Sequence, residues 1–297
     1  MFHGFQPFRI QTQGATINGV HGGAGPPLLL LHGYPQTHLM WRAVAPRLAD
    51  EFTVVAADLR GYGDSSKPPG GDDHAAYSKR AMAQDMVEVM QTLGFPRFMV
   101  AGHDRGARVV HRLCRDHPHA VIRAAVLDIA PTHYMYATTD RVFAEAYYHW
   151  FFLIQPYDLP ERLIGADPEY YLRKKLAHWG RTSSAFEPEV IAEYVRCFSN
   201  PETIHATCED YRAAASIDLQ HDEADQHTLI TCPLLVLWGA QGFVGRHYDL
   251  LTVWRQYAVW RQYAVDVRGH AVPGGHFLPE EAPDETYAAL RAFFAGA

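Results

Sequence analysis

The stretch from Arg97 to Pro118, R-F-M-V-A-G-H-D-R-G-A-R-V-V-H-R-L-C-R-D-H-P, constrains the fold of this chain more than any other. Its apolar start has the composition of a buried strand, and its second half carries apolar residues at helical spacing. The pentapeptide Gly102–Gly106 between them predicts a sharp strand-to-helix turn, where small residues let the two elements approach closely. Such a nucleophile elbow holds one reactive side chain above the edge of a sheet.

The central residue of this turn is Asp104. A carboxylate is ionised at neutral pH without the help of a base, so Asp104 can attack carbon directly and form an ester intermediate. A structural alternative is that Asp104 caps the following helix, because aspartate is a favoured N-cap residue. The pentapeptide alone does not separate these two interpretations.

Length and composition bound the class of protein. The chain has 297 residues, enough for one large domain or a domain with an insertion, and a formal net charge of −7. A nucleic-acid surface would show a basic patch, so we expect a small-molecule substrate and no nucleic-acid partner. No apolar run approaches the roughly 18 residues that span a bilayer, so no membrane partner is expected. The four cysteines form no C-x-x-C pair and the N-terminal residues lack a secretory pattern, which predicts a cytoplasmic location.

Short apolar runs alternate with helical segments along the chain. Several of the runs are continuously apolar, as expected of strands buried on both faces of a parallel sheet. The alternation predicts an α/β fold with a mostly parallel sheet and helices on both faces, where ligand groups gather beyond the carboxyl ends of the strands. The strand candidates are 7–13, 15–21, 28–31, 52–57, 98–101, 124–127, 234–238 and 265–272, and the long helix candidates are 77–93 and 283–294.

The segment from about 131 to 222 interrupts this alternation. Strand runs disappear and aromatic residues become frequent, which predicts several helices inserted between two core strands as a lid over the carboxyl edge. The predicted organisation is a core of residues 1–130 and 223–297 with a helical cap of residues 131–222. Most cap aromatics are expected to be packing residues, because helix packing alone requires large apolar side chains.

Three residues at predicted strand ends form a candidate catalytic set. Asp104 lies at the turn, Asp128 follows the strand candidate 124–127, and His276 follows a pair of glycines. Their order along the chain is nucleophile, acid, base, as in triads built on such sheets. The loop after strand 28–31 contains Tyr34 and can point backbone N–H groups at a ligand as half of an oxyanion hole; the alternative is an ordinary strand-to-helix turn.

With these residues in place, the chain resembles the epoxide hydrolase and dehalogenase branch of the α/β-hydrolase superfamily. The resemblance rests on the motifs H-G-Y-P, D-L-R-G-Y-G-D-S-S-K-P, G-H-D-R-G-A-R and G-G-H-F and covers essentially the whole chain. It implies the α/β-hydrolase fold with an inserted helical lid and a triad of Asp104, Asp128 and His276. It further implies an oxyanion hole made by the backbone N–H groups of Tyr34 and Arg105, with no metal or organic cofactor.

Two arginines beside the nucleophile indicate which members of this branch the chain resembles most. Arg105 follows Asp104 directly, where haloalkane dehalogenases and epoxide hydrolases commonly carry tryptophan, and Arg108 lies one helical step further. Two guanidiniums can clamp a substrate carboxylate by charge-assisted hydrogen bonds. This D-R-x-x-R arrangement resembles the fluoroacetate (haloacetate) dehalogenases. The structural alternative is that one arginine, Arg108 in particular, pairs with a core carboxylate.

The lid supplies the remaining residues that the resemblance implies. His149, Trp150 and Tyr211 match the family's halide-binding His, Trp and Tyr. The implied reaction converts a 2-haloacid such as fluoroacetate to glycolate and halide through an aspartyl ester.

Two alternatives stay open: an epoxide hydrolase that protonates the epoxide oxygen with lid tyrosines, and a non-catalytic relative that binds a small ligand. The oligomeric state is also open, with a homodimer as one option.

The hexapeptide V-W-R-Q-Y-A occurs twice in succession, at 253–258 and 259–264. The unit is shorter than the roughly 20 residues of repeat architectures. Six residues rotate a helix by about 600°, so the two copies cannot share one buried face. We expect a local duplication that lengthens a helix or bulges into a loop, just before the segment that positions His276.

Overall fold

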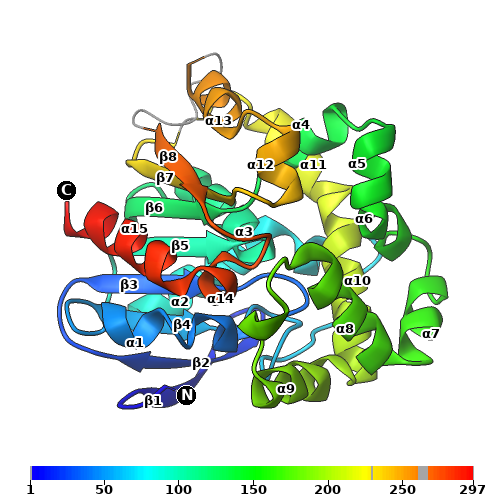
Figure 1. Cartoon of the computed structure of the whole chain (residues 1–297), viewed down its shortest axis with the longest axis horizontal. Helices are drawn as coiled ribbons and strands as arrows, with labels where there is room; N and C mark the ends of the chain where they lie inside the picture. The colour runs from blue at the N-terminus through cyan, green and yellow to red at the C-terminus, as the bar shows by residue number, and fades with distance from the viewer. Residues whose placement is uncertain (1, 229, 260–266, 297) are drawn as a thin grey trace.

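The computed structural model describes residues 2–228, 230–259 and 267–296, and an eight-stranded sheet runs through its centre (Figure 1). The order across the sheet is β1-β2-β4-β3-β5-β6-β7-β8, antiparallel at β1 and β2 and parallel from β4 to β8. The predicted α/β fold with a mostly parallel sheet is therefore confirmed. The strands are β1 (Gln6–Gln11), β2 (Thr16–Gly22), β3 (Pro27–Leu31), β4 (Thr53–Ala57), β5 (Phe98–His103), β6 (Val121–Leu127), β7 (Leu234–Gly239) and β8 (Val267–Val272).

The central strands are buried because helices cover both faces of the sheet. In β3, Leu29 and Leu31 belong to one hydrophobic cluster, whereas Leu28 and Leu30 belong to the other, as the two-residue period of a strand requires. The first cluster also contains side chains of α2 and α3, and the second contains side chains of α1 and α15. These helices are α1 (Ala45–Leu48), α2 (Lys79–Thr92), α3 (Arg105–Asp116) and α15 (Pro283–Ala295).

A block of helices lies between β6 and β7 in the chain and gathers on one side of the sheet, at the right in Figure 1. It covers the edge where the parallel strands end. The division into a core and a cap of residues 131–222 stays a prediction, and its limits fall close to those of this block. The helices are α4 (Thr132–Ala137), α5 (Arg141–Ala146), α6 (Tyr148–Leu153), α7 (Leu159–Gly165), α8 (Pro168–Trp179), η3 (Ser183–Ala185), α9 (Pro188–Phe198), α10 (Pro201–Ala214) and α11 (Ile217–Ala224).

Local chemistry explains where the predicted elements begin. The helix expected from residue 77 begins at Lys79, because the Ser78 side chain accepts a hydrogen bond from the Ala81 N–H and so caps α2. The strand expected at 124–127 begins three residues earlier, at Val121. The remaining short elements of the core are η1 (His38–Trp41), η2 (Ala75–Tyr77), α12 (Phe243–His247), α13 (Leu250–Val259) and α14 (Leu278–Glu281).

The duplicated hexapeptide falls partly within α13. Val253 and Trp254 of the first copy are buried, and the Trp254 indole donates a hydrogen bond to the Ile129 carbonyl at 3.1 Å. Residues 260–264 of the second copy lie outside the described residues, and so does the predicted effect of the duplication on the His276 loop. Within the described part of the chain, no helix is both long enough and apolar enough to cross a membrane.

Candidate active site

Asp104 stands at the junction of β5 and α3 in a backbone conformation that few residues adopt. Its φ is +46°. Such a backbone conformation costs about 1–3 kcal/mol and persists only where the surrounding structure holds it. The surroundings do so here: a Cβ on Gly102 would collide with the backbone of Gly106, and a Cβ on Gly106 would collide with the His32 carbonyl. The interpretation of Asp104 as a helix cap is wrong, because its side chain makes no capping hydrogen bond to α3.

The carboxylate of Asp104 is buried and held by one hydrogen bond. Its Oδ1 accepts from the backbone N–H of Tyr34 at 3.0 Å, and its Oδ2 lies 3.9 Å from Nε2 of His276. Burial acts to raise the pKa of Asp104, but the neighbouring charges of His276 and Arg105 outweigh it and hold the pKa below its ordinary value. The side chain is therefore ionised near neutral pH.

His276 is positioned by its neighbours on both sides. Its Nδ1 lies 2.6 Å from Oδ2 of Asp128, whose Oδ1 accepts a hydrogen bond from the Gly239 N–H at the end of β7. The backbone N–H of His276 donates to the carbonyl of Trp179 at 3.1 Å, which ties this loop to the end of α8. Burial acts to lower the pKa of His276, but the hydrogen bond and charge of Asp128, followed by the charge of Asp104, raise it above its ordinary value.

The two N–H groups predicted as an oxyanion hole lie at this edge. The Tyr34 N–H already points at Oδ1 of Asp104. Arg105 is the first residue of α3, and the N–H groups of a helix's first turn have no acceptor within the helix. Both groups therefore come from the positions at which a tetrahedral intermediate on the Asp104 carbonyl would need donors.

Arg105 is fully buried and bound to a carboxylate that the sequence analysis did not identify. Its Nε donates to Oδ2 of Asp210 at 2.9 Å, and its Nη2 donates to Oδ1 at 2.7 Å. Asp210 also accepts hydrogen bonds from Tyr62 and Lys79. The structural alternative, that one arginine pairs with a core carboxylate, therefore holds for Arg105 and not for Arg108 among the described residues. Nη1 of Arg105 is left without a partner among the described residues.

Arg108 is buried with no carboxylate within ion-pair distance in the described ranges. Its Nη1 donates to Thr132 Oγ1 at 2.9 Å and to the Ala130 carbonyl at 3.2 Å, and its guanidinium lies 4.7 Å from the centre of the Trp150 ring. Burial and the charge of Arg105 lower the pKa of Arg108, but a guanidinium stays protonated in proteins. Arg105 is neutralised by Asp210, so Arg108 is the cation near Asp104 that lacks an ion-pair partner among the described residues.

The three residues expected to bind halide are buried together on α6 and α10. The rings of His149 and Tyr211 lie 5.6 Å apart, and the Arg105 guanidinium lies 4.1 Å from the Tyr211 ring centre. Burial, with the charge of Lys175 as the next cause, holds the pKa of His149 well below its ordinary value, so this imidazole is neutral. A neutral imidazole has one N–H to donate.

Several buried polar atoms around Asp104 lack a hydrogen-bond partner in the part of the chain that the structure describes. An unsatisfied buried polar group costs about 1–3 kcal/mol, so such groups rarely gather without a role. The residues that carry them are linked by the ring and guanidinium contacts given above. The atoms are Nη1 of Arg105, Nε of Arg108, Nδ1 of His149, Nε1 of Trp150, the hydroxyl of Tyr211 and Nε2 of His276.

Asp210 is the functional neighbour that sequence reasoning missed. It lies on a helix, 105 residues after Arg105, and helical periodicity does not indicate which carboxylate faces which arginine. One signal was available, because a buried guanidinium requires a partner and Asp210 immediately precedes Tyr211. Among the described residues, no group of three or more His, Cys, Asp or Glu side chains is placed to hold a metal ion.

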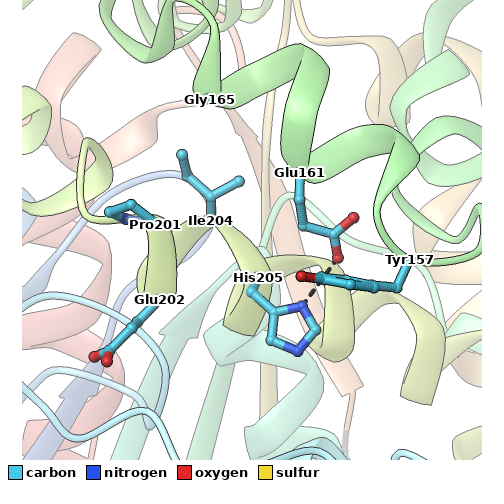
Figure 2. A pocket seen from close by; sticks show the side chains of 7 residues that line it. All are labelled: Tyr157, Glu161, Gly165, Pro201, Glu202, Ile204 and His205. Carbon is cyan, nitrogen blue, oxygen red and sulfur yellow. Dashed lines mark hydrogen bonds and ion pairs between the residues drawn. The ribbon is translucent and has the colours of Figure 1, made fainter.

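Two cavities differ in their relation to this chemistry. Figure 2 shows one of about 480 Å³ on α7 and α10, where Glu161 binds His205 at 3.0 Å and Arg212 at 2.7 Å. No triad residue lines it, and the Glu161 carboxylate is already occupied. A second cavity, of about 360 Å³, is lined by both Asp128 and His276. The smaller cavity is therefore the one connected to the candidate site.

Comparison with known proteins agrees with this geometry. The α/β hydrolase fold family matches residues 26–283. The fluoroacetate dehalogenase of Burkholderia sp is 47% identical over 100% of this chain and 96% of its own length, and the soluble epoxide hydrolase of Corynebacterium sp. (strain C12) is 37% identical over 95% and 96%. Among solved structures, ALR0039 from Nostoc sp PCC 7120 aligns with a TM-score of 0.97 and 62% identity over 100% of both chains.

Proposed function

The chain belongs to the α/β hydrolase family, and from that premise we propose that it is a hydrolytic dehalogenase that converts a 2-haloacid such as fluoroacetate to the 2-hydroxy acid and halide. The observation that carries the proposal is the set of unpartnered buried donors around an ionised Asp104. Some of these donors belong to cations and suit a carboxylate. The others belong to neutral groups and suit a departing halide.

Substrate binding follows from the two arginines. Asp210 fixes the plane of the Arg105 guanidinium, so Arg105 presents only Nη1, and Arg108 presents Nε. A carboxylate between these two atoms receives two charge-assisted hydrogen bonds and compensates the charge of Arg108. The carbon next to that carboxylate then faces Asp104.

The first chemical step is displacement of the halide. Because Oδ1 of Asp104 is held by the Tyr34 N–H, Oδ2 is the oxygen free to attack the carbon that bears the halogen. A carbon–oxygen bond forms as the carbon–halogen bond breaks, and the halide leaves with the bonding electron pair toward His149, Trp150 and Tyr211. Removing one such donor typically costs about 2.7–4 kcal/mol of transition-state stabilisation, which matters for a leaving group as poor as fluoride.

The second step is hydrolysis of the ester, with His276 as general base. Ester formation removes the negative charge of Asp104, one of the groups that raise the pKa of His276, and so makes neutral His276 easier to reach. Nε2 takes a proton from water, and the hydroxide attacks the Asp104 carbonyl while the Tyr34 N–H stabilises Oδ1. When the bond between the carbonyl carbon and Oδ2 breaks, His276 returns the proton to the departing alkoxide oxygen and the Asp104 carboxylate is restored. The 2-hydroxy acid that leaves carries an oxygen from the enzyme and inverted configuration at carbon.

The decisive experiment traps the ester. Replacing His276→Ala should let one equivalent of fluoride appear per protein while the Asp104 peptide gains the mass of a carboxymethyl group. A single turnover of the unaltered protein in ¹⁸O-water should give glycolate with unlabelled oxygen. An unmodified peptide after fluoride release would exclude covalent catalysis.

An epoxide hydrolase is the second candidate, and it draws on one observation. The hydroxyl of Tyr211 is buried without a partner among the described residues, where it could donate to an epoxide oxygen. Burial, followed by the charge of Asp104, holds the pKa of Tyr211 well above its ordinary value, which makes it a better hydrogen-bond donor than proton donor. Turnover of fluoroacetate, chloroacetate and a styrene-type epoxide, measured side by side, separates the two candidates.

A further inference from the structure

The cavity that reaches the triad has a wide mouth and an aromatic wall. The buried residues Asp128 and His276 line it, together with the aromatic side chains of Tyr147, Trp179 and Phe243. Aromatic walls have a low polarity, so charges at the mouth act along the cavity with little screening. The cavity lies between α5 and α8 of the helical block and α12 of the core.

Two arginines stand at the mouth, one from each side. Arg181 follows α8, and Arg246 lies on α12; both are exposed and both line the cavity. Each uses only Nε for a hydrogen bond, Arg181 to the Gln241 carbonyl at 3.3 Å and Arg246 to the Gly242 carbonyl at 3.1 Å. No ion pair with a carboxylate in the described ranges occupies either guanidinium, so their Nη atoms stay available to an anion in the cavity.

The acidic groups near the mouth are already engaged. Glu145 binds Arg141 at 2.7 Å. Glu281 accepts hydrogen bonds from the backbone N–H groups of Arg181 at 2.7 Å and of Gly275 at 3.0 Å. His178 also lines the cavity, but burial, with the charges of Lys175 and Arg181, lowers its pKa, so it is neutral at pH 7. The mouth is thus locally positive on a chain whose formal net charge is −7.

We infer that this cavity is the entrance for a small carboxylate, and that Arg181 and Arg246 capture the carboxylate at the mouth before Arg105 and Arg108 bind it inside. The inference rests on the proposed function, because only an anionic substrate benefits from such a field. A cleft lined by charge of one sign raises association rates by about 10–10³-fold, and salt suppresses the effect. The net negative charge of the chain repels anions, and the two arginines at the mouth offset this repulsion where a haloacid would enter.

The experiment measures association without chemistry. In an Asp104→Asn background, stopped-flow tryptophan fluorescence gives the association and dissociation rate constants of fluoroacetate. The double variant Arg181→Gln/Arg246→Gln should associate about 10-fold more slowly at low ionic strength, with an unchanged dissociation rate constant. At about 1 M salt, where the Debye length is roughly 3 Å, this difference should vanish.

Two controls make the result specific. Arg97→Gln removes the same charge from an exposed position just before β5, at the opposite end of the strand, and should change the association rate constant less than about 2-fold. Arg181→Lys/Arg246→Lys keeps the charge and should keep most of the rate. Equal association rates in the glutamine double variant and the Arg97→Gln control would overturn this inference alone. Failure of fluoroacetate to bind any variant would overturn the proposed function, and the inference with it.

Discussion

Asp58 and Asp104 are both buried carboxylates that follow parallel strands, β4 and β5, yet they are held very differently. Asp58 accepts hydrogen bonds from the Asn18 side chain and from the backbone N–H groups of His38 and Asp64, and it pairs with the His38 ring at 2.8 Å. Asp104 accepts one hydrogen bond, from the Tyr34 N–H. A carboxylate has about four acceptor sites, so Asp58 is saturated and holds loops together, whereas Asp104 keeps lone pairs available for chemistry.

Removing the open carboxylate should abolish activity and leave the fold intact. We expect Asp104→Asn to lower kcat by about 10⁵-fold, as loss of a nucleophile does, with little change in the free energy of unfolding. Halide release and thermal denaturation measure the two quantities. An Asp104→Asn variant that retains a tenth of the activity would contradict the role of Asp104 as the nucleophile.

The second-largest effect concerns the uncompensated cation beside Asp104. Arg108→Gln should lower kcat/KM for fluoroacetate by about 10²–10³-fold, the usual effect of losing a charged donor that contacts the reacting molecule. We also expect acetate to raise the Tm of the unaltered protein and not that of Arg108→Gln, because a ligand bound to the folded state raises Tm. Acetate protection that survives in Arg108→Gln would place the carboxylate elsewhere.

Removing the saturated carboxylate should have the opposite profile. Asp58→Asn is expected to lower the free energy of unfolding by about 2 kcal/mol, because it weakens hydrogen bonds to a buried charge. The folded fraction should keep kcat within a few-fold of the unaltered protein. Urea unfolding and kinetics at low temperature test both halves, and a stable but inactive Asp58→Asn protein would contradict them.

Each carboxylate also governs the titration of its own histidine. Despite the opposing effect of burial, the pKa of His276 is raised by Asp128 and Asp104, and that of His38 by Asp58. Asp104→Asn should therefore lower the pKa of His276 and leave that of His38 in place, and Asp58→Asn should do the reverse, as NMR titration of the two imidazoles can show. Because both pKa values are raised on folding, the stability they contribute is present below about pH 6.5 and is lost as the pH rises through the folded values.

The smallest expected effect is on the pH dependence of stability, and it concerns two buried lysines, one paired with a carboxylate and one not. Lys79 binds Asp210, whereas Nζ of Lys175 lies 3.7 Å from the Tyr148 ring centre and has no hydrogen-bond partner among the described residues. Burial lowers the pKa of Lys175 to about 7. The unfolded chain then binds the proton more tightly, so stability should rise with pH from about 7 to about 10. Lys175→Met should flatten that rise, as urea unfolding measured across this pH range can show.

The fold was predictable because its signals are local. Leu28–Leu31 is a run of leucines, as is typical of a strand buried on both faces, and the glycines around Asp104 indicate the sharp turn directly. The match to the family and the observed sheet confirm the family and the fold class, whereas the roles of the site residues stay predictions. The ion pair of Arg105 with Asp210 was not predictable, because it depends on how α10 is rotated over the sheet.

One hydrogen bond described above joins the helical block to the proton acceptor: the His276 N–H donates to the Trp179 carbonyl at the end of α8. An outward swing of α8 would pull on the loop that carries the imidazole. The orientation of the base is consequently coupled to the position of the helical block through this main-chain contact.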